Sequence, residues 1–464
     1  YYMKITLINP YELGRQPFGL AEPAAFLKRD GHDVSCCDLS IQKLDDCLSM
    51  DTRLVAIYIA MHTATRIAVE ALPKIKQLAP GASLCVYGLY APMNADLFRS
   101  LGVANVIGGE FEYGLCDMAR RIQSGEGERQ TEAETRLEKI QFIAPDRETL
   151  PALSRYAKLI NTDGSTQTVG FAETTRGCKY LCRHCPVVPV YQGRFYVIPA
   201  DIVLEDIRAQ IRAGATHISF GDPDFFNGPG HALRIVQAMH EEFPDISYDA
   251  TIKIEHIVKY PDEIRALGET GCLFILSAVE SMDDDILTLL DKGHTRQDFI
   301  NALAFLRETG ISLAPTFVAF TPWTSLAIYI ELLEQVVSLR LIEAVAPVQL
   351  SIRLLIPAGS YILQLDRLDG VVGEFDAGIL GHPWTHPDPR VDRLQQAIQA
   401  WVSGAETGGV SRADTFRGIW RLAHEAAGIT VPELALEDAG SPVPRLSENW
   451  YCCAEPTCEQ LVSF

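Results

Sequence analysis

The stretch CKYLCRHC, residues 178–185, closely follows the strand-like run TVGFAET, residues 168–174. It places Cys178, Cys182 and Cys185 in one loop at a C-x3-C-x2-C spacing. Thiolates are the usual protein ligands of iron–sulfur clusters, so this loop can bind three irons of a [4Fe-4S] cluster. The remaining iron of such a cluster has no protein ligand and can bind a small molecule.

Closely spaced cysteines are also typical of zinc sites and of disulfides, so the spacing alone leaves these interpretations open. A zinc knuckle needs a fourth ligand nearby. His184 lies inside the cysteine spacing rather than beyond it, which makes it a poor candidate for that ligand. The cluster is the hypothesis that the downstream motifs support.

The cysteine loop resembles the cluster-binding loop of the radical S-adenosylmethionine (SAM) superfamily. The resemblance implies that the open iron binds the amino and carboxylate groups of SAM, and that reduction of the cluster breaks a carbon–sulfur bond of the sulfonium. It implies a [4Fe-4S] cluster and SAM as cofactors. It also implies a small-molecule substrate and an external one-electron reductant of the flavodoxin or ferredoxin type.

Composition narrows the classes of partner. The chain has 464 residues, is 47% hydrophobic and 22% charged, and is long enough for two or three globular domains. Its formal net charge of −20 repels phosphate backbones, so no nucleic-acid partner is expected. No apolar run is long enough to span a bilayer, so no membrane partner is expected either. The N-terminus does not read as a secretion signal, and the twelve cysteines are therefore expected to be reduced thiols in the cytoplasm.

Residues 1–123 alternate strand and helix patterns, which predicts a doubly wound, flavodoxin-like domain. Strands are expected at 3–9, 54–60, 84–88 and 103–107, and helices at 18–30 and 64–79. The block resembles the cobalamin-binding-type domain that precedes many radical SAM cores, through GHDV at 31–34 and GEFE at 109–112. Small residues are wanted where such a sheet meets the corrin, yet the sequence has YGLY at 87–90. Two hypotheses stay open: cobalamin is bound, or the two tyrosines fill its cavity.

Residues 124–167 are predicted to be a polar linker, and residues 168–370 a radical SAM core. Strands of the core are expected at 168–174, 216–220, 247–254, 273–279, 312–320 and 346–354. Six strand–helix units predict a partial (β/α)6 barrel of the TIM type, whose reactive residues lie at the carboxyl ends of the strands. The cysteine loop follows the first strand, which is the expected place.

Residues 371–464 contain no strand series and are predicted to be a mostly helical region with a cysteine-rich tail. Helices are expected at 391–403 and 413–427. The predicted fold class is therefore α/β: a flavodoxin-like domain, a partial barrel and this helical region.

The motif FGDPDFF, residues 220–226, follows the second strand of the core. In the family this position provides a backbone edge that binds the SAM amino group, which assigns Gly221, Asp222 and Asp224 to the cofactor. Either carboxylate can complement the charge of the ammonium. The alternative is an Asp-Pro turn that closes a strand.

Two further strand ends carry candidate SAM ligands. Glu280 and Ser281 match a Glu-Ser pair that binds the SAM ribose in the family, and the alternative is a structural ion pair. Arg353 lies in an apolar run, where a charge is costly unless it is paired. It is assigned either to a bidentate bond with the SAM carboxylate or to an internal salt bridge.

Three residues have open roles. Strand alternation places Lys253 and Glu255 on one face, either inside the barrel or as exposed charges at a strand end, and turns His256 toward the helices. Trp323 follows the fifth strand and either packs on the adenine or belongs to the core.

The tail contains Cys452, Cys453 and Cys458. Three soft thiols suit a thiophilic guest or a redox step. The motif CCAEP resembles the CCAEP-tail radical SAM proteins, whose relatives can carry selenocysteine at the position of Cys453. It is similar to the radical SAM enzymes of arsinothricin biosynthesis, in which tail cysteines bind trivalent arsenic and SAM donates a 3-amino-3-carboxypropyl group. Structural zinc and a disordered tail are the alternatives.

These features predict a radical SAM enzyme that transfers a SAM-derived group, 3-amino-3-carboxypropyl, to a thiophilic substrate such as trivalent arsenic. Cys452, Cys453 and Cys458 would present this substrate. One alternative is a cobalamin-dependent radical SAM methyltransferase, or a rearrangement enzyme, that acts on an organic small molecule. A second alternative is a protein that binds a metal or metalloid without turnover.

Overall fold

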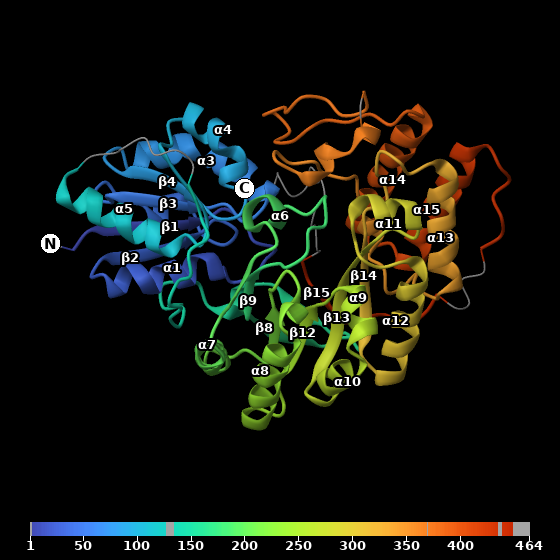
Figure 1. The fold of residues 1–464 in the computed structure, drawn as a ribbon, viewed down its shortest axis with the longest axis horizontal. Helices are drawn as coiled ribbons and strands as arrows, with labels where there is room; N and C mark the ends of the chain where they lie inside the picture. The colour runs from blue at the N-terminus through green and yellow to red at the C-terminus, as the bar shows by residue number, and fades with distance from the viewer. Residues whose placement is uncertain (1, 127–133, 369, 435–438, 449–464) are drawn as a thin grey trace.

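The fold was obtained as a computed structural model, which describes residues 2–126, 134–368, 370–434 and 439–448. An N-terminal sheet domain lies beside a curled second sheet, and helices of the C-terminal region lie above the far end of that second sheet (Figure 1). The cysteine-rich tail, with Cys452, Cys453 and Cys458, lies outside the described residues.

The N-terminal domain is a parallel sheet of six strands in the order β2-β1-β3-β4-β5-β6. Its strands are β1 (Lys4–Asn9), β2 (Asp33–Asp38), β3 (Leu54–Tyr58), β4 (Ser83–Tyr87), β5 (Asn105–Gly109) and β6 (Glu134–Arg136). Its helices are α1 (Phe18–Arg29), α2 (Leu44–Cys47), α3 (His62–Leu78), α4 (Ala95–Ser100) and α5 (Glu112–Ser124). The predicted doubly wound domain is confirmed, and β6 adds residues that the sequence assigned to the linker.

Both faces of this sheet are apolar because helices cover both. Along β3, Leu54 and Ala56 belong to the core under α1 and α5, whereas Val55 and Ile57 belong to the core under α3 and α4. Continuous apolar strands of this kind are typical of parallel sheets that are buried on both sides. Figure 1 shows α1 on one side of the sheet and α3 and α4 on the other.

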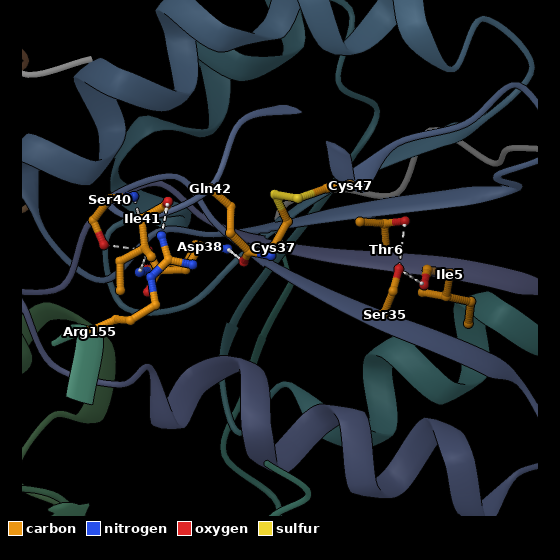
Figure 2. Close-up of a disulfide and its surroundings, with 11 residues drawn as sticks. Ile5, Thr6, Ser35, Cys37, Asp38, Ser40, Ile41, Gln42, Cys47 and Arg155 are labelled. Carbon is orange, nitrogen blue, oxygen red and sulfur yellow. Dashed lines mark hydrogen bonds between the residues drawn. A yellow bond between two sulfur atoms is a disulfide. The ribbon is translucent and has the colours of Figure 1, made fainter. Parts of the chain in front are cut away.

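A disulfide joins Cys37, in β2, to Cys47 at the end of α2 (Figure 2). The expectation that all cysteines are reduced thiols is therefore wrong for this pair. The chain turns back after β2 and brings the two Cα atoms to 5.7 Å, within the range that a disulfide requires. Composition alone cannot reveal such proximity. Six further described cysteines are free thiols: Cys36, Cys85, Cys116, Cys178, Cys182 and Cys272.

The second sheet has the strand order β14-β13-β12-β11-β8-β7-β15. Its parallel strands are β8 (Thr166–Ala172), β11 (His217–Phe220), β12 (Ser247–Thr251), β13 (Cys272–Glu280) and β14 (Ser312–Phe317). Two antiparallel strands, β7 (Lys158–Ile160) and β15 (Arg445–Leu446), extend it at one edge. The outer face is covered by α7 (Ala200–Arg212), α8 (Pro229–Glu242), α10 (Pro261–Glu269) and α12 (Arg296–Thr309) (Figure 1). The sheet therefore curls into a partial barrel, as predicted.

The sixth predicted strand, 346–354, is wrong. Residues Pro347–Leu350 form a 3-10 helix, and only an isolated bridge between Phe320 and Arg353 continues the sheet. Pro347 has no N–H to donate to a strand ladder, which explains why an apolar run does not become a strand here. The third strand also ends early, at Thr251, because α9 (Ile254–Lys259) begins three residues later.

The helical C-terminal region is confirmed. Its two long helices, α14 (Pro389–Thr407) and α15 (Arg412–Ala427), pack on each other, and α15 packs on α13 (Leu326–Ser338). The remaining short elements are α6 (Val187–Tyr191), α11 (Asp284–Leu290), β9 (Thr175–Gly177), β10 (Phe195–Val197) and 3-10 helices at Pro92–Asn94, Leu153–Arg155, Phe225–Asn227, Tyr361–Gln364 and Asp366–Leu368. Within the described ranges, none of the helices combines the length and the apolar character that crossing a membrane would need.

Candidate active site

A cavity of about 300 Å³ lies at the carboxyl ends of the barrel strands, against the N-terminal domain. Its barrel wall includes the loops after β8, β11 and β12 and the end of β13. Its opposite wall comes from the loops that follow β1, β3 and β4. The volume falls at the lower end of the range of small-molecule sites. Both domains therefore build one site.

The three cysteines of the 178–185 loop all line this cavity. Lys253 places its Nζ 3.9 Å from the Sγ atom of Cys182. Burial raises the pKa of the Cys178 thiol to about 12. Among the residues that the structure describes, no three His, Cys, Asp or Glu side chains gather closely enough to hold a single metal ion. A set of three thiols on one cavity wall fits the donor chemistry of a [4Fe-4S] cluster.

The start of the cysteine loop is held by a residue that the sequence did not indicate. Asn227 donates from Nδ2 to the carbonyl oxygen of Gly177 over 3.0 Å, and its Oδ1 accepts from the Lys179 N–H over 3.3 Å. Gly177 has φ +74°, and a Cβ there would lie 2.5 Å from the Arg194 carbonyl oxygen. Only glycine fits this close approach, which lets the chain leave β9 toward the cavity.

Asp222 lines the cavity, but its carboxylate is already engaged. It accepts from the backbone N–H and the hydroxyl of both Thr174 and Thr175, at 2.6 to 3.0 Å. Burial raises its pKa to about 6 even with these bonds. Asp222 therefore fastens the end of β8 to the end of β11. Gly221, beside it, leaves room for the ring of Phe171, which an added Cβ would meet at 1.9 Å.

Asp224 and His256 form a buried pair behind the cavity wall. The Nδ1 atom of His256 lies 2.9 Å from Oδ2 of Asp224, and its Nε2 lies 2.6 Å from the Tyr180 hydroxyl. Tyr180 also donates to Glu255 over 3.2 Å, and the Nζ of Lys253 lies 3.3 Å from the centre of its ring. His256 does not line the cavity, and its ring packs against Tyr260 at the start of α10, with centroids 5.5 Å apart. It lies on α9, beyond the end of β12 at Thr251, so the strand alternation from which its direction was predicted does not extend to it.

Glu280 is an ionised carboxylate on the cavity wall. Its Oε1 lies 3.0 Å from Nε2 of His184 and 3.4 Å from Nζ of Lys292. Burial would raise its pKa, but the charges of Lys292 and His184 outweigh burial and lower the pKa to about 2. The residue has φ +69°, an uncommon conformation for a side chain other than glycine and one that clusters at functional sites.

The structure does not bring three other candidates to the cavity. Arg353 donates to Asp392 over 2.7 Å and stacks on Trp384, so it forms the internal salt bridge that was its alternative. Ser281 accepts from the Asp283 N–H and does not line the cavity. Trp323 packs in the apolar cluster that contains Trp384.

Several wall residues come from the N-terminal domain and were missed by sequence reasoning. Glu12 is 9% exposed, and burial raises its pKa to about 8. The guanidinium of Arg15 lies 4.7 Å from the centre of the Phe171 ring. On the barrel side, Glu173, directly after β8, was also missed, and burial is the main cause that raises its pKa far above the ordinary value. Glu12 and Arg15 directly follow the first strand, a position that a doubly wound fold reserves for ligands, and this was the available signal.

A buried ion cluster joins the two domains just before the cysteine loop. Arg176 contacts Glu22, lies 3.3 Å from Oε2 of Glu110 and lies 2.7 Å from Oε1 of Glu112. These residues are at most 6% exposed in their side chains. Tyr191 donates to Glu110 over 3.0 Å. The GEFE motif therefore serves to hold the β9 strand against the N-terminal domain.

Aromatic rings pack together at the carboxyl edge of the N-terminal sheet, the edge at which such sheets bind ligands. Tyr58 ends β3, Tyr87 ends β4 and Phe111 follows β5, and the ring centroids lie 4.9 to 6.0 Å apart. Tyr87 donates to the Gly19 carbonyl over 2.8 Å, and a Cβ on Gly19 would lie 2.2 Å from the Tyr58 ring. A hollow of about 120 Å³ beside these rings is lined by residues of both domains.

Residues 172–322 match the family model described as the radical SAM superfamily. A protein of Methanocaldococcus jannaschii to which methylthio transfer is attributed is 23% identical over 69% of this chain and 71% of its own length. The bacteriochlorophyllide d C-12(1)-methyltransferase of Chlorobaculum tepidum is 25% identical, over 52% of this chain and 51% of the relative.

Solved structures share the fold. The cobalamin-dependent SAM radical enzyme OxsB has a TM-score of 0.70 at 16% identity and covers 87% of this chain and 67% of its own. The radical SAM methyltransferase TsrM of Kitasatospora setae has a TM-score of 0.59 at 17% identity, over 72% of this chain and 71% of its own. At these identities the likeness establishes the arrangement of domains. The order of sheet domain, partial barrel and helical region is therefore confirmed.

Proposed function

We propose that this protein cleaves SAM reductively at a [4Fe-4S] cluster held by Cys178, Cys182 and Cys185, and transfers a SAM-derived carbon group to a small molecule in the same cavity. One observation carries this proposal. Three thiols, the ionised Glu280 and the two lysines at 253 and 292 line a single cavity at the carboxyl ends of the barrel strands.

The protein groups have distinct tasks in this proposal. The cluster would supply the electron that splits a carbon–sulfur bond of the sulfonium. Glu280, held by His184 and Lys292, offers a fixed negative charge to SAM hydroxyl or amino groups. Gly221 presents a backbone edge at the cavity, and Asp222 keeps that edge aligned with β8. The N-terminal domain covers the cavity mouth and keeps water from the reactive intermediate.

The relatives favour an organic substrate, because their names describe methyl or methylthio transfer. Some of these enzymes are named as cobalamin-dependent. We favour transfer without cobalamin, because the rings of Tyr58, Tyr87 and Phe111 pack at the carboxyl edge of the N-terminal sheet. Aquacobalamin added to the purified protein, followed by gel filtration and an absorbance spectrum, separates the two alternatives. One retained equivalent of cobalamin would contradict our preference.

Transfer to trivalent arsenic is a second candidate, and the place where the tail begins supports it. Tyr11 donates to Glu448, the last described residue, over 2.7 Å. Glu448 lines a hollow of about 80 Å³ that shares Leu13 and Arg15 with the main cavity. Cys452 is the fourth residue after Glu448, and four residues span at most about 14 Å. The last described residue before the tail thus lies beside the cavity.

The test is anaerobic reduction of the reconstituted protein with SAM, with and without arsenite, followed by mass spectrometry. 5′-Deoxyadenosine reports cleavage of the adenosyl bond, methylthioadenosine reports loss of the aminocarboxypropyl group, and S-adenosylhomocysteine reports methyl transfer. We expect at least one of these products in the wild type and none in Cys182→Ala. If none forms in the presence of a reduced four-iron cluster, the proposed function is wrong.

A Cys452→Ser/Cys453→Ser variant decides the arsenic candidate. We expect it to lose any arsenic-containing product while it still cleaves SAM. If the same arsenic product persists, the tail takes no part in the reaction.

A further inference from the structure

The interface between the two domains holds more buried acids than bases. Arg176 is surrounded by the carboxylates of Glu22, Glu110 and Glu112. Arg15 faces the charges of Glu12, Glu173 and Asp249. Two guanidinium groups therefore stand against a larger number of carboxylates in a region that water reaches poorly. Such an excess requires protons or a bound cation.

One of these acids lines the cavity and has an unsatisfied atom. In the part of the chain that the structure describes, the Oε2 atom of Glu12 is buried without a hydrogen-bond partner, and the residue is 9% exposed and lines the cavity. Buried polar atoms in native proteins are almost always paired, so an unpaired oxygen on a side chain that lines a cavity points to a ligand donor. Glu173 lines the same cavity from the barrel side, and its Oε2 lies 3.7 Å from Nε of Arg176.

The loop that carries Glu12 is fixed in an unusual conformation. Leu13 has φ +51° and Gly14 has φ +66°. The Ala157 N–H donates to the Gly14 carbonyl over 2.9 Å, and Tyr11 is bonded to Glu448. A residue with a branched side chain in the left-handed region costs stability, and such strain is kept mainly at binding and catalytic sites. The loop thus holds Glu12 in place before a ligand arrives.

The surroundings of the two glutamates are aromatic. Tyr58 and Phe171 line the cavity beside them, and the guanidinium of Arg15 already lies over the Phe171 ring. An organic amine with an apolar body would suit these surroundings. The carboxylates would bind its ammonium group, and the aromatic faces would contact both the ammonium and the apolar body.

We propose that Glu12 and Glu173 together bind the positively charged amino group of the substrate, which makes the substrate an organic amine with an apolar body. This rests on the proposed function only in taking the cavity as the substrate site. Glu12 comes from the N-terminal wall of the cavity and Glu173 from the barrel wall, so the amino group would lie between the two domains.

The protonation of Glu12 provides a second property of this site that can be measured. Burial raises the pKa of Glu12 to about 8; the charges of Arg15 and Arg147 lower it, and that of Asp38 raises it. The ligand-free carboxyl therefore holds a proton near neutral pH. A bound ammonium lowers this pKa, so binding releases protons.

The test uses the cluster-loaded protein without reductant and three probes with the same frame: 2-phenylethylamine, 2-phenylethanol and 3-phenylpropanoate. Affinities are measured by calorimetry in phosphate and in HEPES, whose different ionisation enthalpies report the protons released. We expect the amine to bind about tenfold or more tightly than the alcohol, as charge-assisted bonds imply, and with proton release. Glu12→Gln should lose both effects, and Glu173→Gln should weaken them.

Glu22→Gln is the matched control. Glu22 is a buried glutamate of the same interface, but it contacts Arg176. It lines neither the main cavity nor the hollow of about 120 Å³. This variant should keep the preference for the amine. Iron content and circular dichroism of each variant establish that it is folded and loaded.

Equal affinity for the amine and the alcohol, or no amine binding at about 10 mM, overturns the proposal. A folded Glu12→Gln protein that keeps the amine preference also overturns it. Since binding is measured without reductant, these outcomes leave the SAM chemistry untouched. Conversely, failure to cleave SAM does not change the binding result.

Discussion

The two parallel sheets of this chain end very differently at their carboxyl edges. In the N-terminal sheet, the rings of Tyr58, Tyr87 and Phe111 pack together at this edge, beside a hollow of about 120 Å³. In the barrel sheet, the corresponding edge carries the thiols and most of the charged side chains of a cavity of about 300 Å³. The two edges thus face one site, to which the barrel contributes the cluster loop and the N-terminal sheet contributes the opposite wall.

This difference shows what the N-terminal domain contributes. Its loops after β1 and β3 supply Glu12, Tyr58 and His62 to the wall of the barrel cavity. The ion cluster of Arg176 fixes the domain against β9, directly before the cysteines. The sheet domain thus serves as the far wall of the barrel's site, and fold resemblance alone would have assigned it a cofactor.

The largest effect is expected from the barrel side. Cys182→Ala removes one thiolate from the cluster loop, so iron content and SAM cleavage should fall to background. Iron and sulfide analysis and product assays check this. Cys116→Ala is the control, since Cys116 is a buried free cysteine of α5 far from the cavity wall, and it should keep full iron content. Normal iron content in Cys182→Ala would contradict the assignment.

The next effect tests the contact between the two regions. Arg176→Met leaves Glu22, Glu110 and Glu112 without their counter-charge, and breaking a buried pair of this kind costs about 3–5 kcal/mol in the free energy of unfolding. Denaturant unfolding measures it.

Arg208→Met is the matched control for that variant. Arg208 pairs with Glu242 on the surface, with side chains about 40% exposed, so its loss should change the free energy of unfolding far less than the loss of Arg176 does. Equal costs for the two variants would mean that the Arg176 cluster does not hold the domains together.

Two glycine substitutions, one at the carboxyl edge of each sheet, test how tightly the two edges are packed. Gly19→Ala would place a Cβ 2.2 Å from the Tyr58 ring, and Gly221→Ala would place one 1.9 Å from the Phe171 ring. Each overpacks its region and should lower the free energy of unfolding by about 1–3 kcal/mol. Gly230→Ala, in α8, meets nothing within 4 Å and should be neutral or slightly stabilising. If Gly19→Ala were as harmless as Gly230→Ala, the carboxyl edge of the N-terminal sheet would be looser than the ring packing implies.

The sequence predicted best where a local pattern determines the structure. The strand–helix alternation identified both sheets, and the C-x3-C-x2-C loop placed Cys178, Cys182 and Cys185 on one cavity wall. It failed where chemistry or geometry interrupts a pattern. Pro347 prevented the sixth strand, and β12 ends at Thr251, so that His256 lies on the helix α9 and not on a strand.

Contacts between segments distant in sequence could not be predicted. Arg353 looked costly in an apolar run, but its partner Asp392 lies 39 residues away on α14. Glu12 and Glu173 meet only because two domains pack together. The disulfide between Cys37 and Cys47 likewise depends on how the chain turns after β2.

The smallest effect concerns the protonation of Glu12 at the boundary between the two regions. Burial raises its pKa from 4.5 to about 8, so between these values the folded state binds the proton more tightly than the unfolded state. This stabilisation is present at low pH and is lost as the pH rises toward about 8. The free energy of unfolding should therefore fall by about 1 kcal/mol between about pH 6.5 and 7.5 on account of Glu12. Glu12→Gln removes the titrating group and should flatten this part of the pH dependence. Glu308→Gln, on the exposed face of α12, should follow the wild type, and an unchanged slope in Glu12→Gln would mean that this carboxyl is already ionised in the folded protein.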